Sequence, residues 1–173
     1  AAPVEFLRDD YAEKLLARLS NFDIPAHKVE LEITEQSLSE HGANYVVRAL
    51  NLLKQAGIQI SLDDFGTGHS SLTRLQDYPV DCIKIDRNFV ERMNSDPSAL
   101  AIVKASTQIG SSIALDVLVE GIENTEQLDT LIHCDCQIGQ GFYFYRPMAG
   151  ASAQALLHPL VQEATIQQSC RQI

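Results

Sequence analysis

The chain has 173 residues, 45% of them hydrophobic, which suits one folded domain with its own core and excludes a disordered chain. Its net charge of −10 argues against binding to a nucleic-acid backbone, because that binding needs a basic surface to replace the counterions of the phosphates. No apolar run approaches the roughly 18 residues of a membrane-spanning helix, and residues 1–6 lack the basic start of a secretory signal.

The first half of the chain alternates helix-like and strand-like segments. Residues 6–20 and 42–56 carry apolar side chains at helical spacing, and Gly57 stands in the usual capping position after the second segment. Between them, residues 29–35 alternate apolar and polar side chains, which predicts a strand with one buried face. An antiparallel edge strand with a solvated acidic face would show the same pattern. The apolar run at 58–62 predicts the next strand.

The second half repeats this alternation. Further strands are predicted at residues 80–86, 113–119 and 136–144. Helical segments are predicted at 72–75, around Phe89 to Met93, at 99–109, at 125–132 and from Ala151 onward, where the Gln-rich end is expected to fray.

The predicted strands share one property, which is that each ends in Asp, Glu or Gln. Because repeated strand-helix units imply a parallel sheet with right-handed crossovers, these ends meet at one edge of the sheet. Acidic surface turns would be scattered through the loops instead. We therefore expect an α/β fold, a TIM-type (β/α) barrel truncated to about five parallel strands with helices. At its functional edge lie Glu32, Asp63, Asp64, Asp86, Glu120 and Gln140.

Carboxylates that converge on one rim repel one another, so this arrangement predicts bound cations. Oxygen ligands select hard divalent ions such as Mg²⁺ or Mn²⁺ over zinc. The adjacent Asp63 and Asp64 suit a two-metal site, in which one carboxylate bridges ions about 3.5–4 Å apart for attack on a phosphodiester.

Lys84 precedes Asp86 by two residues and is expected on the same strand face. A lysine on an inward barrel face is unfavourable unless it is paired. Two roles are open for it: a structural counter-ion to the acids, or a group that orients the attacking water.

Five motifs, in this order and at these spacings, together resemble the EAL-domain cyclic di-GMP phosphodiesterases of bacteria. They are Glu32-Ile-Thr-Glu35, Asp63-Asp-Phe-Gly-Thr-Gly68, Lys84-Ile-Asp86, Glu120-Gly-Ile-Glu123 and Gln140-Gly-Phe142, and the similarity extends from Phe6 to Pro147.

The resemblance implies a role for each matched residue. Glu32 and Asp63 would bind one Mg²⁺ or Mn²⁺ ion, with Asp63 bridging to a second ion held by Asp64, Asp86 and Glu120. The catalytic group would comprise Lys84, which positions the hydrolytic water, together with Glu120 and Gln140. Glu35, supported by Glu123, would anchor the loop at 65–71, which in the family couples metal binding to dimerisation. The implied reaction is hydrolysis of cyclic di-GMP to the linear dinucleotide.

Two motifs of the family are absent from the sequence: the Glu-Ala-Leu segment and the Asn-x-Ser strand, each of which supplies a metal ligand. A complete barrel takes about 250 residues. We therefore expect residues 1–150 to form a partial EAL-type barrel domain and residues 151–173 its C-terminal helix and frayed tail. Such a fragment is expected to be weakly active or inactive alone, and its open sheet needs a partner, for example a second copy.

Alternative functions remain open beside the phosphodiesterase. A non-catalytic cyclic di-GMP receptor would signal by conformational change, and a dimerisation module would use only the scaffold. The retained acids and Lys84 favour the enzyme, because a protein that only binds has no need of so many clustered charges.

The cellular setting follows from the cysteines and from the resemblance. The four cysteines have no zinc-type spacing and predict reduced thiols in the cytoplasm. A membrane anchor elsewhere in the parent protein is compatible with this location. As partners we expect cyclic di-GMP, a second copy in a homodimer, and N-terminal regulatory or GGDEF-type domains in the parent, but no DNA.

Overall fold

The computed structural model describes residues 10–34, 43–66, 75 and 78–157 of the chain. Within them, five parallel strands form one sheet in the order β1-β2-β3-β4-β5. The strands are β1 Glu30–Thr34, β2 Gln59–Phe65, β3 Cys82–Ile85, β4 Asp116–Val119 and β5 Ile138–Gly139. The edge strand β1 is parallel to β2, so an antiparallel edge is excluded and the predicted parallel sheet is confirmed. All carboxyl ends of the strands therefore face one edge of the sheet.

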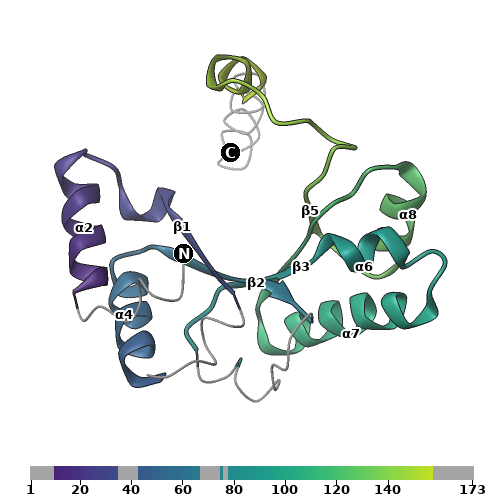
Figure 1. Cartoon of the computed structure of the whole chain (residues 1–173), viewed down its shortest axis with the longest axis horizontal. Helices are drawn as coiled ribbons and strands as arrows, with labels where there is room; N and C mark the ends of the chain where they lie inside the picture. The colour runs from purple at the N-terminus through teal and green to yellow at the C-terminus, as the bar shows by residue number, and fades with distance from the viewer. Residues whose placement is uncertain (1–9, 35–42, 67–74, 76–77, 158–173) are drawn as a thin grey trace, which may run out of the picture.

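The helices run between the strands and lie on the outer side of the curved sheet, with α4 below β2 and α7 below β3 in the view of Figure 1. They are α2 Tyr11–Asn21, the 3₁₀ turn η1 Ala26–Lys28, α4 Ala43–Gln55, α6 Arg87–Arg92, α7 Pro97–Ile113 and α8 Thr125–His133. A further helix at 150–157 stands apart from the sheet, at the top of Figure 1. No helix among the described residues is both long and apolar enough to cross a bilayer.

The core lies between the sheet and these helices, in two clusters. On β1, Leu31 and Ile33 are buried against the helices, whereas Glu30 and Glu32 are exposed on the opposite face, as the alternation predicts. One cluster joins β1 and β2 to α2 and α4, and the other joins β3 and β4 to α6, α7 and α8. The sheet face away from the helices carries polar side chains on β1 to β3 and the apolar Leu118 and Ile138 on β4 and β5.

The prediction of a strand at 113–119 is wrong at its start, because α7 continues to Ile113 and β4 begins only at Asp116. The helix is well started, since Asp96 accepts a hydrogen bond from the N–H of Ser98 at 2.9 Å and Pro97 opens the first turn. It ends where Ala114 adopts a left-handed conformation with φ 57°. Helix α7 is likewise longer than the predicted 99–109.

The strand predicted at 136–144 is reduced to Ile138–Gly139. After Gln140 the chain turns, with the N–H of Tyr143 donating to the carbonyl of Ile122 at 2.9 Å. Gly141 lies directly against the backbone of Ile122, a contact that no side chain could fit.

The strand predicted at 58–62 continues through Asp63 and Asp64 to Phe65, and the strand predicted at 80–86 begins only at Cys82 and ends at Ile85. The remaining predictions agree within the described residues, apart from one or two residues at the ends. The helices predicted at 6–20 and 42–56 correspond to α2 and α4, although residues 6–9 and Gly42 lie outside the described part. The turn predicted at 72–75 lies outside it except for Leu75, and so does the tail from residue 158.

Candidate functional site

The carboxyl edge of the sheet is organised around Lys84 of β3, which is only 5% exposed. Its Nζ lies 2.5 Å from Oε1 of Glu32, 2.6 Å from Oε1 of Glu120 and 3.9 Å from Oδ1 of Asp63. Glu32 comes from β1, Asp63 from β2, and Glu120 directly follows β4. Four neighbouring strands thus bring together four predicted site residues, which we call the rim cluster: Glu32, Asp63, Lys84 and Glu120.

The charge state of Lys84 follows from these contacts. Burial lowers the pKa of the ammonium, but the hydrogen bonds to Glu120 and Glu32 and the charges of Glu120 and Asp63 raise it further, so the pKa stands above its ordinary value. The side chain is therefore protonated at neutral pH and is an acceptable buried cation only because the acids pair with it.

Asp63 and Asp64 both lie within β2, although adjacent strand residues normally point to opposite faces. The register between β2 and β3 is irregular between Leu62 and Phe65, and Asp64 has a φ of 56°. The N–H of Asp64 donates to Oδ1 of Asp63 at 3.0 Å. This local distortion turns both carboxylates toward the same edge.

Asp64 lies within the electrostatic field of the other acids. Partial burial raises its pKa, and so do the charges of Asp63, Asp86 and Glu120 and a hydrogen bond with the Asp86 side chain. Asp86 also caps helix α6, because its Oδ1 accepts the N–H of Asn88 at 2.9 Å. Asp64 and Asp86 thus extend the rim cluster along the same edge of the sheet.

Gln140 and Glu123 lie near the rim cluster and are positioned by backbone hydrogen bonds. The backbone N–H of Gln140 donates to the carbonyl of Val119 at 2.8 Å, which sets the residue beside Glu120, and its side chain is exposed. The side chain of Glu123 is also exposed, and its N–H donates to Oε1 of Gln127 at 2.8 Å at the start of α8. Glu35 and most of the loop it was predicted to anchor, from Thr67 onward, lie outside the described residues.

A second polar layer, which we call the lower cluster, lies nearer the amino ends of the same strands and was not predicted. It consists of Glu30, Ser61, Cys82 and Asp116. The fully buried Ser61 donates its hydroxyl to Oε1 of Glu30. Burial raises the pKa of the Cys82 thiol, as do the charges of Glu30 and Asp116, while hydrogen bonds at Leu118 and Ser61 lower it. The inward parity of these residues along the predicted strands is the signal that would have found them.

Arg146 and Phe142 are a further pair that the sequence alone did not single out. The guanidinium carbon of Arg146 lies 4.6 Å from the centre of the Phe142 ring, a cation–π contact. Both line a groove of about 360 Å³ that begins at Gln140. The groove places an aromatic face and a positive charge beside the rim.

The donor chemistry of the rim fits a hard divalent ion, since all five predicted ligands are carboxylates: Glu32, Asp63, Asp64, Asp86 and Glu120. Within the described residues, however, no group of three or more His, Cys, Asp or Glu side chains is arranged to hold an ion. Three of the five carboxylates lie around the ammonium of Lys84 instead.

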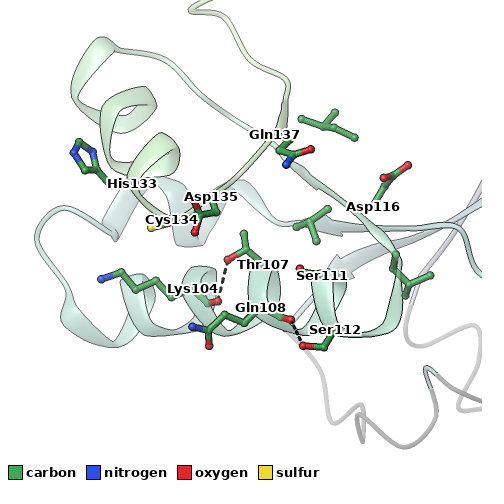
Figure 2. A pocket seen from close by; sticks show the side chains of 13 residues that line it. Lys104, Thr107, Gln108, Ser111, Ser112, Asp116, His133, Cys134, Asp135 and Gln137 are labelled. Atoms are coloured by element: carbon green, nitrogen blue, oxygen red, sulfur yellow. Dashed lines mark hydrogen bonds between the residues drawn. The ribbon is translucent and has the colours of Figure 1, made fainter.

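A larger pocket, of about 930 Å³, lies elsewhere, between α7 and the end of α8 (Figure 2). Hydroxyls that line it are engaged with their own helix: Thr107 donates to the carbonyl of Lys104 at 2.9 Å and Ser112 to that of Gln108 at 2.7 Å. None of the predicted site residues borders it. Because this pocket lies at the amino end of β4 and contains none of the predicted site residues, we assign the chemistry to the rim.

A family model described as EAL domain matches residues 3–147. Cyclic di-GMP phosphodiesterase RocR of Pseudomonas aeruginosa is 37% identical over 137 residues, which cover 79% of this chain and 35% of RocR. The chain spans 15% to 35% of the length of the curated relatives it matches.

Solved structures agree with this match. PaMucR phosphodiesterase in its c-di-GMP complex superimposes with a TM-score of 0.82 at 31% identity, over 88% of this chain and 62% of that one. The manganese and cyclic di-GMP complex of Klebsiella pneumoniae BlrP1 gives a TM-score of 0.74 at 27% identity, over 83% of this chain and 36% of that one.

Proposed function

The chain is a member of the EAL domain family, as its five motifs predicted, and from this premise we propose that it takes part in metal-dependent hydrolysis of cyclic di-GMP. The product would be the linear dinucleotide. One observation carries the proposal, namely the convergence of Lys84 and three carboxylates from neighbouring strands at the carboxyl edge of the sheet. In TIM-type barrels, the confirmed fold class, that edge carries the catalytic residues.

Two similar proteins support this substrate. RocR is named a cyclic di-GMP phosphodiesterase, and PaMucR was solved with c-di-GMP bound. The acidic chain needs local positive charge to receive such an anion. Arg146 supplies it in the neighbouring groove, and bound divalent ions would supply it at the rim, where the charge of Lys84 is balanced by three carboxylates.

Glu32 and Asp63 are the proposed ligands of one Mg²⁺ or Mn²⁺ ion, and Asp63, Asp64, Asp86 and Glu120 those of a second. A BlrP1 structure that contains manganese with cyclic di-GMP supports a divalent ion of this kind. Such ions, when bound, would lower the pKa of a water and neutralise charge on the phosphodiester. Asp63 can serve both ions because the distortion of β2 turns its carboxylate and that of Asp64 to the same edge.

The other residues would orient the reactants. Lys84 would hold the attacking water, Glu120 would accept a hydrogen bond from that water, and Gln140 beside Glu120 would contact water or substrate through its exposed amide. Glu35 and Glu123 would fix the loop that follows Asp64.

We expect weak activity or none from the 173 residues alone, because the sequence contains neither of the two further motifs that supply metal ligands in the family. The proposed setting is the bacterial cytoplasm, as a homodimer and joined to regulatory or GGDEF-type domains. Curated relatives several times longer than the matched region support additional domains.

The decisive experiment incubates the chain, and the same chain extended to a complete EAL domain, with cyclic di-GMP and Mg²⁺ or Mn²⁺ and separates the products. We expect the extended domain to release the linear dinucleotide and the chain to release little. No turnover by the extended domain, despite binding of cyclic di-GMP, would contradict the phosphodiesterase.

That outcome would favour the second candidate, a cyclic di-GMP receptor. One observation speaks for it: within the described residues the acids are paired with Lys84 rather than arranged around a vacant metal position. A dimerisation module would bind neither the ion nor the dinucleotide.

A further inference from the structure

Lys84 makes contacts that a group needed only to orient water would not require. Its ammonium reaches acids on both sides of β3: Glu32 and Asp63 from β1 and β2, and Glu120 from the end of β4. Its side chain is 7% exposed, whereas those of Glu32, Asp63 and Glu120 are 51%, 27% and 27% exposed. The lysine is thus the buried centre, and the acids surround it from the solvent side.

Charge balance explains why this centre matters. Three carboxylates within reach of one point repel one another, and a single positive charge between them removes much of that repulsion. The ammonium, in turn, is stable in its buried position only while the acids pair with it. The geometry of the rim cluster therefore depends on the lysine when no other cation is present.

We propose that Lys84 is an internal cation that holds the rim carboxylates together in the metal-free chain, and that a divalent ion must take Glu32 away from it. The second half rests on the proposed function, because it requires Glu32 to be a metal ligand. Its structural basis is that Oε1 of Glu32 lies 2.5 Å from Nζ, while no described group of acids is arranged to hold an ion. Metal binding is then an exchange of one cation for another.

The simpler alternative is that Lys84 only positions water or substrate. Removal of a buried charge that has no structural role would leave the metal-free chain equally stable or make it more stable. Removal of an internal cation leaves uncompensated acids and must weaken the fold. The two roles therefore predict opposite signs for one measurement.

The first experiment compares thermal unfolding of the metal-free chain with that of Lys84→Met and Lys84→Met/Glu32→Gln. We expect Lys84→Met to lower the Tm by roughly 5–10 °C, and the added Glu32→Gln to restore about half of the loss. In the wild-type background the same Glu32→Gln should lower the Tm, so its effect changes sign. An unchanged or raised Tm for Lys84→Met, or no restoration by Glu32→Gln, overturns the proposal.

The matched control is Lys54→Met, which removes a lysine whose side chain is 40% exposed. Among the described residues Lys54 pairs with one carboxylate, Asp81 at 2.9 Å, and donates to the carbonyls of Pro79 and Val80. Its Tm should change by less than about 2 °C. If Lys84→Met does not fold, Lys84→Met/Glu32→Gln/Glu120→Gln decides: recovery of the cooperative transition supports the proposal, and a chain that stays unfolded contradicts it.

The second experiment titrates Mn²⁺ alone into the folded variants by calorimetry. Because Lys84 competes for Glu32, Lys84→Met should bind Mn²⁺ roughly tenfold more tightly than the wild-type chain. If Lys84→Met does not fold, Lys84→Met/Glu120→Gln is compared with Glu120→Gln, and the same tenfold difference is expected. Lys84→Arg keeps the positive charge and should not bind Mn²⁺ more tightly. Equal or weaker binding contradicts the exchange. The Tm measurements do not involve cyclic di-GMP, so they can support the role of Lys84 even if the proposed phosphodiesterase activity is not found. Conversely, a negative result for Mn²⁺ exchange does not change what the product analysis says about that activity.

Discussion

The rim cluster and the lower cluster are built on the same strands and the same sheet face, yet they neutralise acids in different ways. In the rim cluster a buried ammonium pairs with three carboxylates. In the lower cluster Glu30 receives a hydroxyl from Ser61, and no cation is paired with Glu30 or Asp116 among the described residues. In the lower cluster the neutral hydroxyl of Ser61 is enough, because it serves one acid with one hydrogen bond. In the rim cluster three acids converge, and their mutual repulsion requires a positive charge.

This difference separates positions that are built to receive cations from positions that only satisfy polar groups. The rim lies at the carboxyl ends of the strands, where ligands approach, and the lower cluster lies deeper along them. If the assignment is correct, changes at the rim should act mainly on chemistry and changes in the lower cluster mainly on stability.

The largest effect is expected from loss of the bridging acid. In the complete EAL domain, Asp63→Ala should reduce hydrolysis of cyclic di-GMP by roughly 10³-fold or more, because both proposed ions lose a shared ligand. Turnover measured by chromatography of the products checks this. Asp116→Ala, an acid of the lower cluster, is the matched control and should stay within a few-fold of the parent rate; equal losses would abolish the distinction between the clusters.

The next effect concerns stability in the lower cluster. Ser61→Ala should lower the free energy of unfolding by about 1 kcal/mol, because the buried Ser61 loses its hydrogen bond to Glu30, whose exposed carboxylate is then left to water. Urea denaturation of the chain measures it. Ser95→Ala removes an exposed hydroxyl that donates to the carbonyl of Arg92 at 3.2 Å, and should cost less than about 0.5 kcal/mol.

A smaller effect is expected on the reactivity of Cys82. Burial and the neighbouring acids raise its pKa, so with the other three cysteines replaced by serine it should react with iodoacetamide several-fold more slowly at about pH 8 than an unperturbed thiol. Asp116→Asn should speed the reaction by removing one of those charges. A rate equal to that of free cysteine would contradict the described environment.

The smallest effect is a pH dependence at the rim. Because the pKa of Asp64 is raised in the folded chain, its contribution to stability is present below the unfolded pKa and is lost as the pH rises through the folded pKa. The metal-free chain should therefore gain stability from this residue as the pH falls from about 7 toward about 4. Urea denaturation should show that Asp64→Asn gains less stability than the wild-type chain as the pH falls. If the two chains gain equally, the pH dependence comes from groups other than Asp64.

Much of the fold could be predicted because the signals were local. Apolar runs that end in acids located β1 to β3, and the strict alternation from Val29 to Glu35 gave the buried face of β1 correctly. The boundary between α7 and β4 could not be predicted, since Ile113, Ala114 and Leu115 continue an apolar pattern compatible with either element. Likewise, the close approach of Gly141 to Ile122, which ends β5, is a tertiary contact.

The candidate site was predicted as a set of residues but not as an arrangement. Position at the strand ends singled out Glu32, Asp63, Lys84 and Glu120, which do meet. The distortion of β2 at Asp64 had no signal beyond the following glycines, and Lys84 as the centre of the acids emerges only when four strands are assembled. The lower cluster could not be predicted from the strand ends, because its residues lie within the strands and meet only when the strands are paired in register.

Asp86 has a consequence for how the domain can change in evolution. Its Oδ1 caps α6, and asparagine offers the same oxygen to the N–H of Asn88. Asp86→Asn thus removes a negative charge from the proposed ion site and keeps the helix start, and one base change in a codon accomplishes it. At Asp86, therefore, the charge of the proposed ion site and the start of α6 can change independently of each other.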